Sequence, residues 1–94
     1  MTAPAVKTVV ALEPYVVRVV FADGEVRDVD MGPLLEGPIF KPLRDPAVFA
    51  QVDVDEYAET IVWPNGADVD PDVLYGIASP TVGPAPVVSV PTHV

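Results

Sequence analysis

Hydrophobic positions near the N-terminus follow the two-residue period of β-strands. Residues 6–12 are rich in Val and Thr, which predicts a first strand. Residues 15–21 predict a second strand, and the side chains that share one of its faces are those of Tyr15, Val17, Val19 and Phe21. Because only Arg18 makes the opposite face polar, we expect this strand to lie at or near the middle of a sheet.

The dipeptide Glu13-Pro14 separates these two runs and predicts a tight connection between them. Such a connection would place Val10 beside Val17 and Leu12 beside Tyr15, with all four side chains on one face. The two runs would then form the first strand pair of the sheet.

The dipeptide Asp23-Gly24 lies between two β-rich runs and predicts a hairpin turn, because both residue types tolerate the backbone conformations that such turns need. The third strand would cover residues 25–30. A two-residue loop would pair Val19 with Asp28, whereas a three-residue loop would pair Arg18 with Asp28 as opposite charges. The sequence leaves both registers open.

The rest of the chain predicts short elements separated by Pro and Gly. They are a turn or single helical turn at 31–38, an irregular apolar segment at 39–43, a short helix at 44–51, strands at 52–55 and 59–63, and a short helix at 71–76. Both helices begin where an Asp, Asp45 or Asp70, can cap a helix that opens with Pro.

Together these elements predict an α+β fold, in which a small antiparallel β-sheet built from an N-terminal hairpin or meander carries two short helices. We expect residues 1–78 to form a single α+β domain. Residues 79–94 are rich in Pro and Val and predict an extended, flexible tail. The alternative is that residues 87–90 add as a strand to a sheet.

Charge is distributed unevenly along the 94 residues. The whole chain has a net charge of −9, and residues 23–72 alone contain three basic and thirteen acidic residues. So acidic a surface repels nucleic-acid phosphates, which argues against direct nucleic-acid binding. The acidic residues either keep the protein soluble or complement a basic protein partner.

Several features bear on where the protein works. The sequence contains no Cys, and its first ten residues hold one Lys and no long apolar run, so we expect no signal peptide. The charge-free stretch at 73–94 is interrupted by prolines and does not predict a membrane span. We therefore expect a cytoplasmic protein.

Residue types that carry catalysis are scarce. The only histidine, His93, lies in the expected tail, and no glycine-rich phosphate loop is present. Residues 68–72 resemble half of a calcium loop, but the Gly and Glu that complete such a loop are missing. A weak divalent-cation site would have to rest on the carboxylates of Asp53, Asp55, Glu56 and Glu59. We predict no catalytic residue, no cofactor and no metal site.

The segment 63–66 places Trp63 directly before a Pro-Asn-Gly turn. A lone Trp at a strand end is more often a core residue, although it can also anchor an interface. We expect Trp63 to be a core residue first, and we retain the interface role as a second hypothesis. The candidate interaction surface consists of Trp63, Asn65, Asp68, Asp70, Asp53 and Asp55.

Several sequence blocks, spread over about residues 6–76, together resemble the bacterial family of unknown function DUF2442. They are Phe21–Glu25, Val29–Met31 with Leu34-Leu35, Gly37–Asp45, Phe49–Val52, Thr60–Asp68 and Pro71–Tyr75. The resemblance implies a small α+β fold, like the N-terminal domain of a Nitrosomonas protein that also carries a helix-turn-helix. It also implies a gene encoded beside a second small protein, in pairs that look like toxin–antitoxin modules. It brings no catalytic residue.

Two functions follow as hypotheses. The first is a non-enzymatic, acidic protein-interaction domain, the antitoxin-like partner of a basic, neighbour-encoded small protein. The alternative is a regulatory or ligand-sensing domain with a small pocket near Trp63. An enzyme would have to work with carboxylates alone, such as those of Asp53, Asp55, Asp68 and Asp70. Short edge strands and surface Val residues also favour a homodimer.

Overall fold

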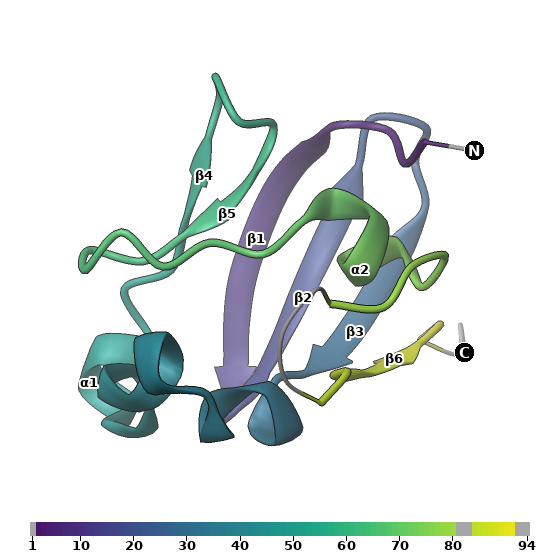
Figure 1. Ribbon diagram of the computed structural model, residues 1–94. Coiled ribbons are helices and arrows are strands. Elements are labelled where there is room, and N and C mark those ends of the chain that lie inside the picture. The colour runs from purple at the N-terminus through teal and green to yellow at the C-terminus, as the bar shows by residue number, and fades with distance from the viewer. Residues whose placement is uncertain (1, 81–83, 92–94) are drawn as a thin grey trace.

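The structure is a computed structural model that describes residues 2–80 and 84–91 (Figure 1). In chain order its elements are β1 (Val6–Glu13), β2 (Val16–Phe21), β3 (Val26–Asp30), the 3-10 helices η1 (Gly32–Glu36) and η2 (Pro38–Arg44), α1 (Pro46–Phe49), β4 (Asp53–Asp55), β5 (Thr60–Val62), α2 (Pro71–Tyr75) and β6 (Val87–Ser89). Four strands form an antiparallel sheet in the order β1-β2-β3-β6, and β4 and β5 form a second, smaller sheet. The expected α+β class is confirmed.

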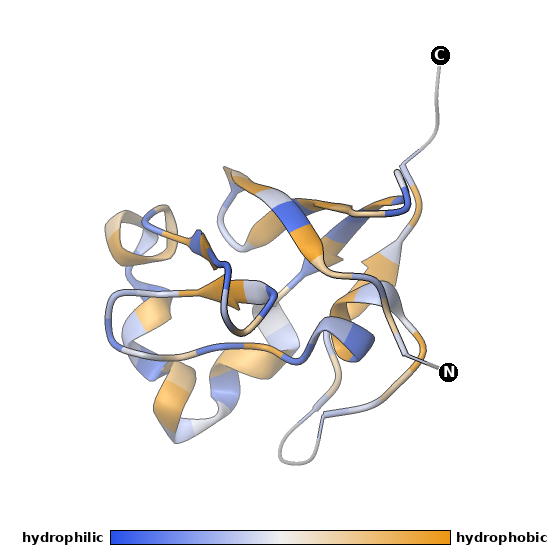
Figure 2. Ribbon diagram, turned by 90° about the horizontal axis from the view of Figure 1, so that it is seen from above, coloured by the Kyte–Doolittle hydropathy of each residue, from blue (hydrophilic) through white to orange (hydrophobic). Residues whose placement is uncertain are grey.

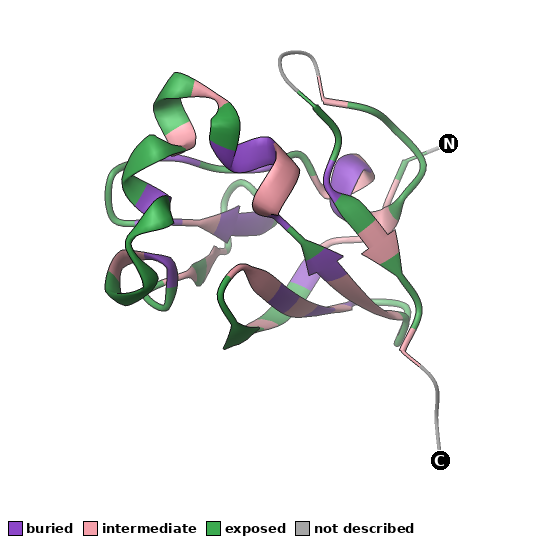
Figure 3. Ribbon diagram, turned by 90° about the horizontal axis from the view of Figure 1, so that it is seen from below, coloured by how far each residue is buried: buried purple, intermediate pink, exposed green. Residues whose placement is uncertain are grey.

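One face of the four-stranded sheet forms the floor of the core. In β2, buried residues alternate with half-buried ones, and the buried set is Val17, Val19 and Phe21. Helix α2 packs on this face, because the ring of Tyr75 meets that of Phe21 edge-on with 4.8 Å between centroids. The buried residues gather where the strands meet the other elements (Figure 3).

Helix α2 is tied to the β2–β3 hairpin by polar contacts as well. The hydroxyl of Tyr75 donates to the carboxylate of Asp23 at 2.7 Å, across 52 positions of sequence. The guanidinium of Arg27 lies over the Tyr75 ring, 4.5 Å from its centroid. This hydrogen bond lowers the pKa of Asp23 and raises that of Tyr75. The hairpin turn and the helix therefore hold one another in place.

The register of the β2–β3 hairpin is the three-residue-loop alternative. Arg18 pairs with Asp28, and the loop is closed by a 2.9 Å hydrogen bond from Phe21 N to Glu25 O. Gly24 takes a φ of +87°, which is accessible to Gly without steric penalty. The ion pair that made this register attractive is present, with Arg18 Nε 2.7 Å from Asp28 Oδ1.

The predicted pairing of β1 with β2 is wrong by one residue. Val10 lies opposite Arg18 rather than Val17, and Ala11 takes the place opposite Val17. The register shifts between Ala11 and Glu13, so an irregularity at this end of the strand absorbs the extra residue. As a result Val10 and Leu12 point to solvent, with 51% and 46% of their surface exposed.

Both predicted helix caps are confirmed. The Asp45 carboxylate accepts from Ala47 N at 3.0 Å, and that of Asp70 accepts from Asp72 N at 2.8 Å. Gly76 ends α2 in the left-handed conformation. The segment expected to be irregular at 39–43 instead lies within the 3-10 helix η2. Pro38 opens this helix, where its missing N–H costs no hydrogen bond, and Pro42 lies inside it.

The C-terminal region differs from the predicted flexible tail at Val87–Ser89, which pair with Asp28–Asp30 as strand β6. The prolines that suggested a loose tail flank this edge strand instead of interrupting it, a position where Pro is tolerated. Val88 lies opposite the buried Val29 and packs against the core. Residues 81–83 and 92–94, the latter including His93, lie outside the described residues.

Candidate functional site

Trp63 belongs to the core. Its side chain is 2% exposed, and its indole N–H donates to the carbonyl of Phe49 at 2.9 Å. The two rings pack at a tilt of 37° with centroids 5.7 Å apart. The core role predicted first is confirmed, and the polar edge of the ring is already satisfied inside the fold.

Three of the other predicted surface residues hold turns and caps. Asn65 accepts from Ala67 N at 3.1 Å within the turn after β5. Asp55 accepts from Tyr57 N at 2.9 Å in the turn between β4 and β5. Asp70 is the cap of α2 described above. Their side-chain oxygens are engaged locally, so these residues shape loops rather than form one shared patch.

Asp53 lies in a groove between β1 and the β4–β5 hairpin. The groove has a volume of about 860 Å³. One wall consists of Ala5 and the first residues of β1, up to Val9. The other wall carries the side chains of Asp53, Val54, Glu56 and Glu59. Three exposed carboxylates therefore face this groove, and among the described residues that line it Lys7 is the one basic side chain. We call this feature the acidic groove.

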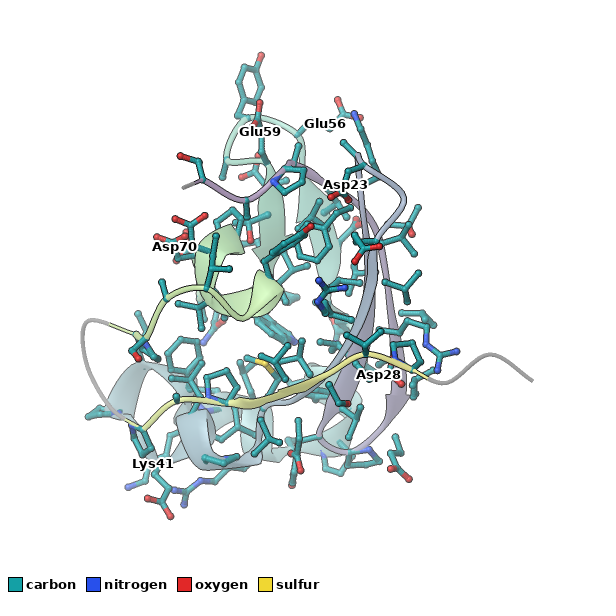
Figure 4. All side chains as sticks on the ribbon, turned by 90° about the vertical axis from the view of Figure 1, so that its right-hand side faces the viewer. Asp23, Asp28, Lys41, Glu56, Glu59 and Asp70 are labelled. Carbon is teal, nitrogen blue, oxygen red and sulfur yellow. The ribbon has the colours of Figure 1, made fainter. Side chains whose placement is uncertain are left out.

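The turn of the β4–β5 hairpin places its carboxylates along the acidic groove. Asp55 O accepts from Glu59 N at 2.8 Å, and Glu59 takes a φ of +60°, which turns the chain back into β5. The carbonyl of Glu59 then accepts from Val6 N at 3.0 Å, which fastens the hairpin to the start of β1. Glu56 and Glu59 consequently lie together at one end of the molecule, opposite Lys41 (Figure 4).

Strand β1 also has an open edge. In the described part of the chain β2 is its only strand partner, and its other edge makes one backbone hydrogen bond, the one from Val6 N. Unpaired backbone groups on an edge strand can accept a further extended segment. The acidic groove thus combines carboxylates with a strand edge that retains bonding capacity.

Asp68 and Asp70 lie elsewhere. They line a smaller hollow of about 250 Å³ together with the apolar side chains of Leu34, Phe40 and Val73. The residues predicted as one interaction surface are thus divided between the core (Trp63), two local turns (Asn65, Asp55), the acidic groove (Asp53) and this hollow (Asp68, Asp70).

The sheet face that does not meet the core is a third surface, which we call the outer face. Cross-strand neighbours share a face, so it contains the apolar residues Val10, Val16, Val20, Val26 and Val87 and the polar or charged residues Thr8, Glu13, Arg18, Asp28, Asp30 and Ser89. Hydrophobic residues run along the strands of the sheet (Figure 2). At its centre the Arg18 guanidinium donates to both carboxylate oxygens of Asp28, at 2.7 and 2.9 Å.

Acid is expected to weaken this pair. The hydrogen bonds from Arg18 hold the pKa of the Asp28 carboxyl below its ordinary value. A carboxyl with a lowered folded-state pKa stabilises the fold above its unfolded pKa, and this contribution disappears as the pH falls through the folded-state pKa. Melting temperatures measured from about pH 6 to pH 2 should decline, with the contribution of this pair lost below about pH 4. The Asp28→Asn variant should lose less on acidification; equal losses would contradict this assignment.

The described residues contain no group of three or more His, Asp or Glu side chains arranged to hold a metal ion. Asp53, Glu56 and Glu59 line the groove without converging on one point that such an ion could occupy. Among the same residues, no helix has the length and apolar character needed to cross a membrane.

Comparison with known proteins shows to which family the chain belongs. The sequence profile of the family described as "Protein of unknown function (DUF2442)" matches residues 6–79. The chain belongs to the DUF2442 family. The resemblance recognised in the sequence blocks is therefore confirmed, and it covers every strand of the fold except β6.

The chain is also similar to a solved structure. This DUF2442 chain is similar to the crystal structure of "Putative DNA Binding Protein NE0471" from Nitrosomonas europaea, at 36% identity and a TM-score of 0.62. The similarity covers 67% of this chain and 41% of that one, so the chain corresponds to about two fifths of the Nitrosomonas protein. None of the curated proteins matches the chain.

Sequence reasoning placed Glu56 and Glu59 only in a weak cation site and left them out of the interaction surface. It also missed the wall that β1 contributes to the groove in this DUF2442 domain. The signal for the carboxylates was present, since Asp53, Glu56 and Glu59 lie within seven positions. The contact between β1 and the hairpin is tertiary and has no local signature.

Proposed function

We propose that this DUF2442 chain is a non-enzymatic protein-interaction domain that binds a basic, extended segment of a protein partner in the acidic groove. The observation that carries the proposal is the geometry of that groove. Asp53, Glu56 and Glu59 face the open edge of β1 across a space large enough for a peptide segment. Lys or Arg side chains would pair with the carboxylates, while backbone groups of the segment would bond to the strand edge.

The charge of the whole chain supports the same partner. A net charge of −9 draws a basic protein towards the domain and raises the rate of encounter. The partner we propose is a small basic protein encoded beside this one, to which the domain would stand as an antitoxin-like partner. Co-purification of the two neighbouring gene products would test that identity.

The name of the Nitrosomonas protein refers to DNA, but we do not extend DNA binding to this chain. Phosphate contact needs a basic surface, and this chain has five basic against fourteen acidic residues. A ligand-sensing role beside Trp63 also has less support, because that side chain is closely packed and its N–H is bonded to Phe49.

The groove is tested with a synthetic peptide of about eight alternating Lys and Val residues, with an otherwise identical Glu and Val peptide as the control probe. Amide chemical shifts are followed by NMR as each peptide is added. We expect the Lys peptide to bind with a Kd on the order of 100 μM, to shift amides of β1, β4 and β5, and to weaken with added salt. The Glu peptide should produce no such shifts.

The triple variant Asp53→Asn, Glu56→Gln, Glu59→Gln should bind the Lys peptide about tenfold more weakly. The matched control is Glu13→Gln, Glu36→Gln, Asp68→Asn, which removes the same charge from exposed positions outside the groove lining. It should weaken binding by no more than about threefold. Equal losses in the two variants would show that only diffuse charge matters and would contradict the proposed groove.

A further inference from the structure

The outer face combines partly exposed valines with a central ion pair. Val10 and Val87, at opposite edges of the sheet, are 51% and 59% exposed. Val20 lies opposite Val26 on one side of the Arg18–Asp28 pair, and Val16 lies on the other side, in the row of Val87; these three valines are half-buried. These valines surround the Arg18–Asp28 pair, and a face with several partly exposed apolar side chains is a candidate interaction surface.

The outer face carries a small part of the chain's net charge. Arg18 and Asp28 form a bidentate pair in the middle of the face, and Asp30, at the rim, accepts from Gly32 N at 2.9 Å. Glu13, opposite Val16, is the remaining charged residue among these cross-strand neighbours, so the face carries a charge of −2, while the chain carries −9. A basic partner would be drawn to the acidic surfaces elsewhere, whereas a second copy, equally acidic, meets the least repulsion here.

We infer that the outer face of the four-stranded sheet is the interface of a homodimer, in which two copies stack this face against each other. The same patch on both subunits is what a two-fold dimer requires. Two sheets stacked in this way lie about 10 Å apart, and their Val side chains interdigitate between them. The Arg18–Asp28 pair would enter the interface with its hydrogen bonds already made. The acidic groove lies beside the edge of β1 that does not pair with β2. It therefore stays open to its own partner in this arrangement.

The size of the face sets the strength of the dimer. Four strands about 4.8 Å apart give the width of the face, and about six residues per strand with a rise of about 3.3 Å each give its length. The footprint is therefore roughly 400 Å² per copy. A standard stable interface uses about 800 Å² per partner. Covering the charged pair also carries a desolvation penalty. The dimer is therefore a reversible one that forms at high micromolar concentration.

Sedimentation velocity of the full chain from about 5 μM to 1 mM tests this inference. The weight-average mass should rise from 10.0 kDa towards twice that value. The variant Val10→Asp, at an exposed position of the outer face, should weaken dimerisation by at least about tenfold. Ile39→Asp changes a residue that is 61% exposed on η2, away from this face, and should leave the dimer intact. A chain that stays monomeric at 1 mM, or equal effects of the two variants, would overturn the inference.

Amide hydrogen exchange separates face stacking from the other way in which this sheet could dimerise, by pairing of two β1 edges. Edge pairing would give new backbone hydrogen bonds and protect amides along β1 as the concentration rises. Face stacking leaves those amides unprotected and shifts side-chain methyl signals of Val10, Val20 and Val26. Concentration-dependent protection along β1 would contradict the stacked dimer.

Discussion

Replacing Trp63 by alanine should leave the domain largely unfolded at room temperature. The indole is 2% exposed and packs on Phe49, so the change opens a large cavity at the centre of the core. Substitutions of this kind cost about 3–5 kcal/mol. The Phe49 carbonyl would also lose its buried donor, which adds about 1–3 kcal/mol. A domain of this size has little more than that total in reserve.

Urea denaturation followed by circular dichroism measures this effect, since the variant lacks the fluorescent indole. Trp63→Phe keeps an aromatic ring and loses mainly the hydrogen bond, so it should be destabilised by a smaller amount, about 2–3 kcal/mol. Tyr57→Ala is the matched control, because Tyr57 is fully exposed, and its free energy of unfolding should change by less than about 0.5 kcal/mol. A Trp63→Ala protein within about 1 kcal/mol of wild type would be incompatible with the buried position described here.

The variant Val88→Asp should detach β6 from the sheet. Val88 packs against the core opposite Val29, and Gly76 lies so close that a Cβ there would be 3.4 Å from Val88 Cγ1. An Asp at this position would place an unpaired carboxylate against apolar groups, at a cost of about 2–4 kcal/mol. Strand β3 would then present an unpaired edge, and the protein should become prone to aggregation.

The neighbouring Val87→Asp variant is the natural comparison. Val87 lies in the same strand but is 59% exposed, so its free energy of unfolding should change by less than about 0.5 kcal/mol. Both variants are measured by urea denaturation at low micromolar concentration and by amide hydrogen exchange in β3. If the two had the same effect, the assignment of Val88 to the inner face of the sheet would be wrong.

Features that depend on a few neighbouring residues could be predicted from the sequence. Asp45 and Asp70 cap helices because an acceptor two positions before a free N–H is a local arrangement. Asp23-Gly24 makes a hairpin because Gly24 supplies the positive φ that the loop needs. The alternation of β2 correctly placed Val17, Val19 and Phe21 on one face, since the residues that share a face are fixed by the period of the strand alone.

Features that depend on distant partners could not be predicted in the same way. The sequence around Val88 predicts a flexible tail, because nothing local indicates that Val29 and the end of α2 pack beside it. The pairing of β1 was misjudged by one residue because the irregularity near Leu12 leaves no mark on the hydrophobic pattern. The acidic groove depends on a hydrogen bond from Val6 to Glu59, 53 positions apart in the sequence.

The position of β6 in the sheet has a consequence for the order in which the protein folds. Strands β1, β2 and β3 are consecutive, so the meander can form as soon as the first 30 residues are available. The fourth strand joins β3 only across 61 positions, as the contact between Ser89 and Asp28 shows. Contacts of such separation form slowly, because a long loop must close first. During synthesis on the ribosome, the edge of β3 therefore stays unpaired until β6 has been synthesised, and in this interval the nascent protein is most exposed to misassembly.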